Sequence, residues 1–432
     1  MFFQKDIETL PRDEIRSIQL TRLKNTVKYC LDNVPLYRER FAAAGLSEDS
    51  IKDLSDLQKL PFTTKKDMHS TYPFGFFAVP MQKIVRMHAS SGTTGKPTVI
   101  GYTKNDIDNW SDCMARLCAG AGATDNDIVQ ICFGYGLFTG ALGLHYALEK
   151  IGAAVVPNSS GNTEKTLMLM EDFGTTAIVS TPSYAEYLGE LAREKGILDR
   201  LHLKLGLLGS EGCTPEMRDH IEKTLGIFVT DNYGMSELGG PGVSGDCEFR
   251  CGMHINEDHF LCEIIDPETG EVLPEGSQGE LVVTTLTKEG FPMIRYRTRD
   301  ITRIVYDKCE CGRTFARMDK IKGRSDDMLK IRGVNVFPSQ IEAVLMKYPE
   351  VAPHYQIVVT REHYSDKLEV RVELTDSVNL DDYQNITAMQ ENVRDGLKSV
   401  LGIDTKITLV SPKTIERFQG KAKRIVDLRK PL

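Results

Sequence analysis

The pattern of hydrophobic and polar positions divides the chain into four regions. Residues 11–32 place apolar side chains at helical spacing among polar neighbours, which predicts an amphipathic helix. This helix belongs to a longer segment, residues 1–85, whose helical patterns are interrupted by prolines at Pro35, Pro61, Pro73 and Pro80. We therefore expect a helical N-terminal segment over residues 1–85.

In the second region, apolar runs alternate with amphipathic stretches from about residue 128. The apolar runs predict strands at 128–133, 153–157, 176–181, 203–210 and 227–234. The stretches between them predict helices at 140–152, 163–174, 182–196 and 215–226. Repeated strand–helix alternation at this spacing predicts an α/β fold with a parallel sheet flanked by helices.

The pattern changes again after about residue 243. Short strands separated by Gly/Pro turns predict a mostly antiparallel β region over about 244–322. Residues 322–340 are polar and punctuated by glycine, which is typical of a hinge. Beyond it lies an α+β unit the size of a small domain. Its expected elements are a helix at 338–348, strands at 356–362 and 367–374, a helix at 381–400, a strand at 405–411 and a basic tail.

Composition narrows the class of protein. A chain of 432 residues is too long for a single core, and 41% hydrophobic with 26% charged residues is typical of a soluble globular protein. The net charge of −8 gives no support for nucleic-acid binding. We see neither a signal peptide nor an apolar run long enough to span a membrane, so we expect a cytoplasmic protein.

Half of the ten cysteines are concentrated between residues 247 and 311. The segment CEFRCGMH supplies Cys247, Cys251 and His254, and the segment CECGRT supplies Cys309 and Cys311. Two close groups of ligands separated by a β region suit a tetrahedral structural zinc ion. The alternative is a set of reduced thiols without a metal.

The segment SSGTTGKP, residues 90–97, has the composition of a phosphate-binding loop. Small residues let the backbone approach an anion closely, while hydroxyl groups and a lysine add donors and charge. It is not a Walker A loop, because only two residues separate its glycines and a proline follows its lysine. The candidate nucleotide-binding residues are Ser90, Ser91, Gly92, Thr93, Thr94, Gly95 and Lys96. The alternative is an ordinary surface turn.

Three other segments have side chains suited to a nucleotide. In YGMSELGG, Tyr233 can stack on a planar base and Glu237 can hold Mg²⁺. In YRTRDIT, Asp300 can accept hydrogen bonds from two ribose hydroxyls. Near the end of the chain, Lys421 follows a glycine in RFQGKAKRIVD. Taken singly, each segment is equally well a loop, a solvated charge pair or a basic tail.

In their order along nearly the whole chain, these segments resemble the core motifs of the adenylate-forming superfamily of acyl-CoA synthetases. Longer matches narrow the resemblance to phenylacetate–CoA ligases, through FGYGLFTGALGLHY, NYGMSELGGPGV, RYRTRDITRI and SDDMLKIRGVNVFPSQIE. One departure is Met235, where leucine is common, a swap that conserves volume.

The resemblance implies an N-terminal ATP- and acyl-binding domain, residues 1–325, and a mobile C-terminal domain, residues 326–432. It implies that Lys421 is the catalytic lysine, bridging the substrate carboxylate and the α-phosphate, and that Asp326 is the hinge residue. Besides the loop, Glu237 and Asp300, the nucleotide-binding residues implied are Glu211, Asp231, Tyr233, Gly234, Met235, Ser236, Arg324 and Lys66.

The resemblance also implies an acyl pocket lined from 133–145 and 209–236. Tyr135 and Phe138 would form its aromatic wall, and Gly212 would leave room for a ring; the alternative is that the aromatic side chains belong to the core. For the metal, the recurring pattern selects Cys247, His254, Cys309 and Cys311 and leaves out Cys251, although Cys251 in place of His254 would make a four-cysteine site.

The activity implied is ATP-dependent ligation of an aryl-acetic acid such as phenylacetate to CoA through an acyl-adenylate. Mg²⁺ and a structural zinc ion accompany ATP and CoA, and a homodimer is expected. Indole-acetic, hydroxyphenylacetic and benzoic acids stay open as substrates. The alternatives are transfer to an acceptor other than CoA and a non-catalytic nucleotide-binding regulator.

Overall fold

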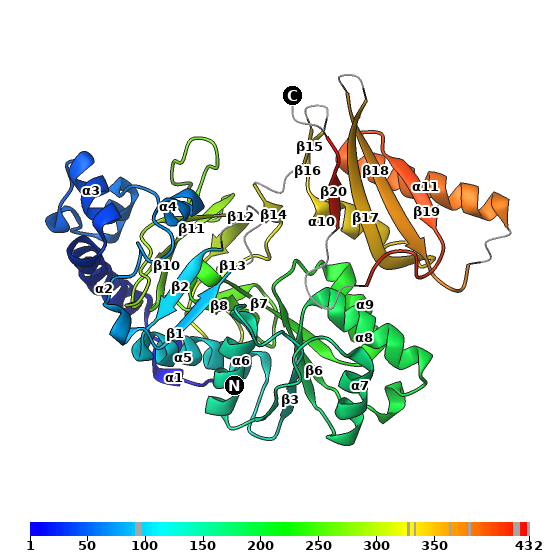
Figure 1. Cartoon of the computed structure of the whole chain (residues 1–432), viewed down its shortest axis with the longest axis horizontal. Helices are drawn as coiled ribbons and strands as arrows, with labels where there is room; N and C mark the ends of the chain where they lie inside the picture. The colour runs from blue at the N-terminus through cyan, green and yellow to red at the C-terminus, as the bar shows by residue number, and fades with distance from the viewer. Residues whose placement is uncertain are drawn as a thin grey trace. The chain divides into compact units, whose positions relative to one another are not determined.

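A computed structural model describes residues 1–90, 97–325, 329–331, 334–362, 365–378, 382–417 and 424–429. The chain divides into two compact units (Figure 1). Unit 1 comprises Met1–Ser180, Leu201–Ser210 and Phe228–Ile321. Unit 2 comprises Thr181–Arg200, Glu211–Ile227 and Lys322–Leu432. The domain boundary at 325/326 stays a prediction.

Unit 1 begins with helices, as the sequence predicts. These are α1 (Lys5–Glu8), α2 (Arg12–Asn33), α3 (Pro35–Ala43) and α4 (Lys65–Ser70), with 3₁₀ turns at Glu48–Ser50, Leu54–Lys59 and Met81–Lys83. An antiparallel hairpin of β1 (Arg86–Ala89) and β2 (Val99–Tyr102) follows, and leads into α5 (Lys104–Ala121). The loop 91–96 between β1 and β2 lies outside the described residues.

The parallel half of the main sheet confirms the predicted strand–helix alternation. Its strands run in the order β4 (Ala154–Val156), β3 (Ile128–Ile131), β5 (Ala177–Ser180), β6 (Leu205–Gly209) and β7 (Phe228–Met235). They are connected by α6 (Gly140–Ile151), α7 (Thr163–Asp172), α8 (Pro182–Glu194) and α9 (Pro215–Leu225). In such sheets, ligands bind at the carboxyl ends of the strands.

The sheet continues from β7 as an antiparallel region, which confirms the change of pattern after residue 243. Its order is β8 (Gly240–Gly245), β9 (Met253–Ile255), β13 (Arg317–Met318), β12 (Tyr296–Val305), β11 (Gln278–Thr285) and β10 (Phe260–Ile265). The turn from β7 into β8 requires glycine, because a Cβ on Gly234 would lie 2.0 Å from the carbonyl oxygen of Gly240.

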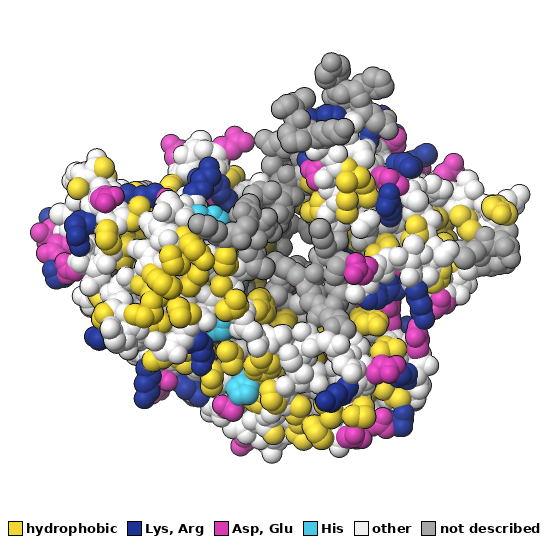
Figure 2. Space-filling model, viewed as in Figure 1, with side chains coloured by type: hydrophobic (Ala, Val, Ile, Leu, Met, Phe, Trp, Pro, Cys, Tyr) yellow, Lys and Arg dark blue, Asp and Glu magenta, His cyan; other side chains and the backbone are white. Residues whose placement is uncertain are grey.

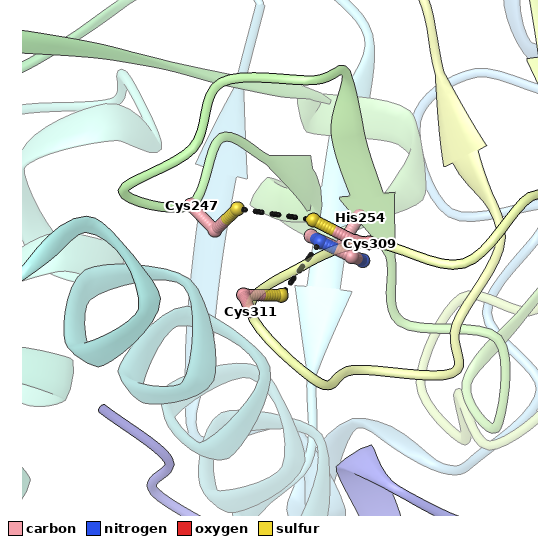
Figure 3. Close-up of side chains that lie close together, drawn as sticks. All are labelled: Cys247, His254, Cys309 and Cys311. Carbon is pink, nitrogen blue, oxygen red and sulfur yellow. Dashed lines mark hydrogen bonds between the residues drawn. The ribbon is translucent and has the colours of Figure 1, made fainter.

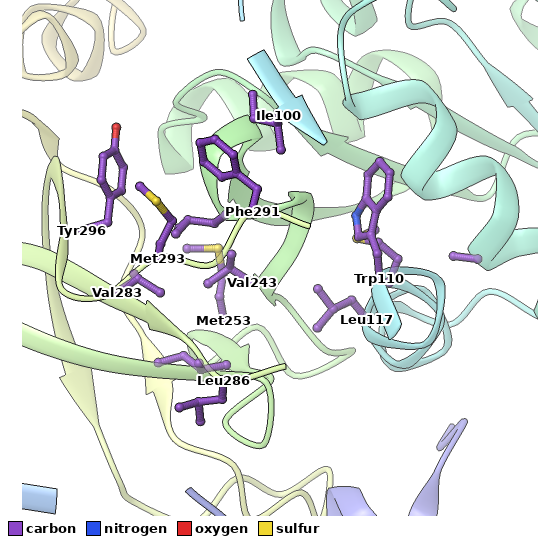
Figure 4. Close-up of a cluster of buried hydrophobic side chains, with 14 of the residues drawn as sticks. Ile100, Trp110, Leu117, Val243, Met253, Val283, Leu286, Phe291, Met293 and Tyr296 are labelled. Atoms are coloured by element: carbon purple, nitrogen blue, oxygen red, sulfur yellow. The ribbon is translucent and has the colours of Figure 1, made fainter. Parts of the chain in front are cut away.

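The core of unit 1 fixes the hairpin and the turn relative to each other. Its buried side chains come from the N-terminal helices, α5, α6 and both halves of the sheet; some of them are drawn in Figure 4. Trp110 of α5 stacks on Tyr102 of β2 with ring centroids 5.4 Å apart. Its indole Nε1–H donates to the carbonyl of Pro241 at 2.5 Å. One aromatic side chain therefore joins β2 to β8.

The C-terminal segment has its own core, between a four-stranded sheet and two helices. The sheet order is β19 (Lys406–Val410), β18 (Ser365–Leu374), β17 (Val351–Glu362) and β20 (Ile425–Asp427), with α10 (Pro338–Leu345) and α11 (Tyr383–Leu401). The short strands β14 (Gly323–Arg324), β15 (Leu329–Ile331) and β16 (Val334–Val336) precede it. No helix in the described residues is long and apolar enough to cross a membrane.

The sequence pattern predicted neither the β1–β2 hairpin nor α5, and it predicted no strand in the basic tail. The basic tail contains β20, which pairs in parallel with β17 through Ile357 and Ile425. The strand has only three residues and lies among charged neighbours, so no alternation of apolar and polar side chains predicts it. Its formation depends on pairing with the edge of β17.

Within unit 2, charged side chains connect α8 to the C-terminal segment. His354 Nε2 lies 2.9 Å from Glu190 Oε1, and Lys413 Nζ lies 2.6 Å from Glu194 Oε1. Arg417 lies 3.6 Å from Glu190 as well as 2.6 Å from Glu373. These contacts are polar and partly exposed, so we assign them a small share of the stability.

Candidate active site

The β1–β2 hairpin holds the base of the predicted phosphate loop. The backbone N–H of Ser90 donates to the carbonyl of Thr98 at 3.0 Å, and the N–H of Thr98 donates to the Ser90 hydroxyl at 3.3 Å. These two bonds bring the ends of the loop together. Ser90 therefore helps to close the base of the loop. Its hydroxyl oxygen accepts one of these bonds, and its hydroxyl proton can still be donated to a ligand.

Glu237 lies in the 3₁₀ turn Ser236–Leu238, directly after the carboxyl end of β7. The residue is buried, and no hydrogen bond or ion pair is recorded for its carboxylate among the described residues. The preceding Ser236 hydroxyl lies 3.3 Å from Thr139 Oγ1, at the start of α6. A buried, unpaired carboxylate at this edge of the sheet is suited to a divalent cation.

Tyr233 and Asp300, which are 67 residues apart, come together at the same edge. The Tyr233 hydroxyl donates to Asp300 Oδ2 at 2.6 Å. Asp300 is buried on β12, and its backbone N–H donates to the Thr298 hydroxyl at 3.1 Å. One carboxylate oxygen of Asp300 is thus already engaged by the phenol, which fixes the tyrosine ring that we expect to stack on adenine.

The other predicted nucleotide-binding residues have varied surroundings. Asp231 lies on β7, 3.7 Å from the Lys320 ammonium, and Met235 ends that strand. In unit 2, the Glu211 carboxylate accepts a 2.6 Å hydrogen bond from the Ser183 hydroxyl, while Arg324 lies in β14. Their roles in nucleotide binding stay predictions.

Lys66 is exposed on the short helix α4. That helix begins after Thr64, its N-cap, and the Asp67 carboxylate accepts a hydrogen bond from the Thr64 backbone N–H at 2.7 Å. The remaining predicted residues lie outside the described parts of the chain: Ser91, Gly92, Thr93, Thr94, Gly95, Lys96, Asp326 and Lys421.

The predicted acyl-pocket loop runs between β3 and α6, close to the hairpin. The carbonyl of Leu137 accepts from the backbone N–H of Ala89 at 3.0 Å. Phe138 packs against Phe133 but is 42% exposed, so it does not belong to the core. In unit 2, a Cβ added to Gly212 would meet nothing within 4 Å, and the expected role of Gly212 in an acyl pocket stays a prediction.

Sequence reasoning missed the side chains that hold Tyr135. Its hydroxyl lies 3.0 Å from His145 Nδ1, and His145 Nε2 lies 3.1 Å from Glu149 Oε1. His145 and Glu149 are one helical turn apart on α6, so their spacing was a usable signal. Their approach to Tyr135 depends on how the loop between β3 and α6 folds back onto α6. No local sequence pattern predicts that conformation.

The four residues predicted to hold zinc come together in unit 1 (Figure 3). Cys247 follows β8, His254 lies on β9, and Cys309 and Cys311 lie in the turn between β12 and β13. One ligand atom from each lies within 4.8 Å of all the others. The Sγ atoms of Cys247 and Cys309 are 3.7 Å apart, and Cys311 Sγ lies 3.3 Å from His254 Nε2.

The electrostatics of the cluster suit a cation. A hydrogen bond with the Cys247 thiol, joined by the contact with His254, lowers the pKa of Cys311 and favours its thiolate. Cys251 is exposed, with its Sγ 3.4 Å from the carbonyl of Phe249, and is not among the four. Cys262 lies on β10 and packs against the core.

Comparison with known proteins identifies the family to which the chain belongs. Residues 19–287 match the family described as AMP-binding enzyme, and residues 333–429 match the AMP-binding enzyme C-terminal domain. Among solved structures, 2-hydroxyisobutyryl-CoA ligase in the postadenylation state, bound to R3-HIB-AMP, superposes with a TM-score of 0.93. It is 30% identical, and the match covers 99% of this chain and 92% of that one.

The two family matches and the fold show that the chain is an AMP-binding enzyme of the adenylate-forming class. Two curated relatives narrow this further. The phenylacetate-coenzyme A ligase of Thermus thermophilus is 48% identical over 446 residues, with both chains fully covered. That of Escherichia coli is 49% identical over 426 residues, covering 98% of this chain and 97% of the relative. The chain belongs to the phenylacetate–CoA ligase family.

Proposed function

We propose that this protein is an ATP-dependent phenylacetate–CoA ligase. The observation that carries the proposal is 48–49% identity to phenylacetate-coenzyme A ligases over essentially the full length of both chains. At this identity and coverage, the two matched AMP-binding regions and the segments between them are shared with the relatives.

The reaction has two half-reactions. A carboxylate oxygen of the acid attacks the α-phosphorus of ATP, the bond to the leaving pyrophosphate breaks, and an acyl-adenylate forms. The CoA sulfur then bonds to the acyl carbon, the bond from that carbon to AMP breaks, and the thiol proton passes to solvent. The protein's work is to align the reactants and neutralise the charge that develops.

The residues divide this work between two ends of the nucleotide. Tyr233 and Asp300 hold the adenosine end, and Glu237 would hold Mg²⁺, which neutralises phosphate charge when bound. The loop 90–96 binds the phosphates in our proposal. Lys421 bridges the acid and the α-phosphate, and Asp326 is the hinge of a mobile C-terminal domain, residues 326–432.

A panel of aryl acids tests the function. Pyrophosphate release is measured for phenylacetic, hydroxyphenylacetic, indole-acetic and benzoic acids, with and without CoA, together with thioester formation. We expect phenylacetate to give the highest kcat/KM and CoA to convert the adenylate into AMP and thioester. Pyrophosphate release without thioester would indicate a different acceptor, and AMP binding without any turnover would indicate a regulator.

We further propose that Cys247, His254, Cys309 and Cys311 bind a structural zinc ion. Four soft or borderline donors from two turns match the preferred ligand set and number of zinc. In Cys309→Ser we expect less than one zinc ion per chain by elemental analysis and a lower thermal midpoint. Cys262→Ser, outside the cluster, should keep its zinc. Full zinc content in Cys309→Ser would overturn the proposed site.

We also propose a cytoplasmic homodimer. Figure 2 shows hydrophobic side chains gathered over the β1–β2 hairpin, and an exposed apolar patch supports self-association. The large exposed hydrophobic side chains of residues 72–87, which lead into and include β1, are Tyr72, Phe74, Met81, Val85 and Met87. Light scattering on the purified chain tests the mass: a monomer at micromolar concentration would overturn the dimer.

A further inference from the structure

Lys288 brings a positive charge to the buried end of the site. Its side chain is half-buried, and its Nζ donates to the backbone carbonyl of Glu237 at 3.3 Å. The ammonium also lies over two aromatic faces, 5.1 Å from the ring centroid of Tyr102 and 5.3 Å from that of Phe291, which is labelled in Figure 4. These contacts orient the charge without neutralising it.

The segment that carries Lys288 is held firmly. The Asp106 carboxylate accepts from the backbone N–H groups of Glu289 at 2.7 Å and Gly290 at 2.8 Å. Gly290 passes so close to β2 that a Cβ there would lie 2.6 Å from the carbonyl oxygen of Gly101. Lys288 is therefore fixed beside the hairpin whose loop is expected to bind phosphate.

In the part of the chain that the structure describes, no carboxylate forms a salt bridge with this ammonium. Among the described residues, no salt bridge is recorded for Lys288, and the single hydrogen bond uses one of its three N–H donors. Burial lowers the pKa of Lys288 to about 8, although the Asp106 and Glu237 carboxylates oppose that effect. The ammonium form is therefore costly here unless an anion arrives beside it.

Two neighbouring groups are unpaired in the same way. The Tyr102 hydroxyl is buried and has no hydrogen-bond partner among the described residues. Burial raises its pKa, so it keeps its proton and remains a donor. Glu237 is buried too, and its carboxylate forms no hydrogen bond or ion pair with the described residues. We call Lys288, Tyr102 and Glu237 the phosphate-end group.

The charges of the phosphate-end group fit one ligand. The Glu237 carboxylate is suited to bind a cation and the Lys288 ammonium to bind an anion. No salt bridge joins the two side chains, so neither charge is neutralised by the other. A magnesium–polyphosphate supplies both charges at once. A tightly packed structural pair would instead place the carboxylate on the ammonium.

We propose that Lys288 is a binding residue for the leaving pyrophosphate of ATP. The proposal rests on the proposed function, because pyrophosphate is the leaving group of adenylation. It assigns Lys288 to the β- and γ-phosphates, since the adenosine end is occupied by Tyr233 and Asp300. AMP, which lacks those phosphates, should not contact it.

The test is calorimetric binding of magnesium pyrophosphate and of AMP to the full-length protein. We expect Lys288→Met to weaken pyrophosphate binding by about tenfold or more, the usual loss for a charge-assisted hydrogen bond, and to change AMP binding by less than about twofold. Lys288→Arg should recover much of the loss. Lys24→Met, which changes an exposed lysine of α2, is the matched control and should behave as wild type.

Three results would overturn the proposal: unchanged pyrophosphate binding in Lys288→Met, no pyrophosphate binding by the wild type, or equal weakening of AMP and pyrophosphate with a lower thermal midpoint. The last would mean that the lysine only anchors the aromatic rings. If Lys288→Met does not fold, Lys288→Gln keeps a donor to Glu237 and removes the charge. The binding experiment contains no aryl acid, so its outcome does not depend on the acid panel. Failure of the acid panel would overturn the proposed function and leave the measured pyrophosphate binding unaffected.

Discussion

Two groups of buried charge in unit 1 differ in how they are neutralised. In the first, Arg116 donates to both oxygens of Asp258, at 2.7 and 3.1 Å, and His259 Nε2 lies 3.2 Å from the same carboxylate. We call these three residues the Asp258 cluster. In the phosphate-end group, by contrast, the lysine and the carboxylate have no salt bridge. The two groups are neighbours, because His259 Nδ1 lies 2.7 Å from the hydroxyl of Thr287, the residue before Lys288.

The difference separates structural charge from functional charge. In the Asp258 cluster each ion has its counter-ion within the fold, so the folded state gains if the cluster stays complete. In the phosphate-end group, burying the charged side chains costs free energy, and no salt bridge between Glu237 and Lys288 offsets that cost. Such a site is stabilised only when its ligand binds, which is the expected signature of a preorganised charged site.

The largest effect is expected from breaking the Asp258 cluster. Asp258→Asn leaves Arg116 buried without a counter-charge, so we expect a loss of about 3–5 kcal/mol in the free energy of unfolding. Thermal and urea unfolding measure it. Asp32→Asn, which removes an exposed helical ion pair with Lys28, should change stability by less than about 0.5 kcal/mol. If Asp258→Asn changed stability as little as Asp32→Asn does, the structural role assigned to the Asp258 cluster would be wrong.

Removing the unpaired carboxylate should act in the opposite sense on stability. Glu237→Gln removes a buried charge that has no partner, so we expect unchanged or higher stability in the absence of ligand. Adenylation should fall by about 100-fold or more, because magnesium loses its protein ligand. ATP–pyrophosphate exchange and unfolding are measured on the same preparation. A destabilised variant with normal exchange would show that Glu237 is structural.

The smallest effect, when it is counted per pH unit, is a pH dependence of the Asp258 cluster. Burial alone would lower the pKa of His259, but Cys113 and Asp258 together raise it to about 9, from an ordinary value of 6.5. Because the folded-state pKa is the higher one, this stabilisation is complete below pH 6.5 and is lost as pH rises through 9. We expect a loss of up to about 1.4 kcal/mol per pH unit in that window.

The matched variant for this pH dependence is His259→Gln, which cannot be protonated. Its unfolding free energy should lack the decline between about pH 6.5 and 9, so the two curves should converge at the alkaline end. Unfolding at a series of pH values measures both proteins. Parallel curves across the window would mean that His259 does not carry the effect.

Much of the fold and part of the site follow from local patterns. Helical and strand periods placed α6–α9 and β3–β7 within a few residues, because each element's apolar face repeats along its own length. The spacing of CEFRCGMH and CECGRT predicted a cluster that the structure brings together, because two short turns can each present ligands without distant help. Strand β20 and the approach of His145 to Tyr135 escaped prediction, since both depend on partners far along the chain.

The sequence by itself determined the order of elements, the candidate residues and the family resemblance, because these properties depend on residue types and on short-range spacing. The tertiary structure alone decided which charges are paired. Lys288 in LTKEG has the pattern of a surface lysine, yet the fold places it against Tyr102, Phe291 and the carbonyl of Glu237. Whether a buried charge meets a counter-ion depends on the packing of segments nearly 200 residues apart, and no local pattern encodes that distance.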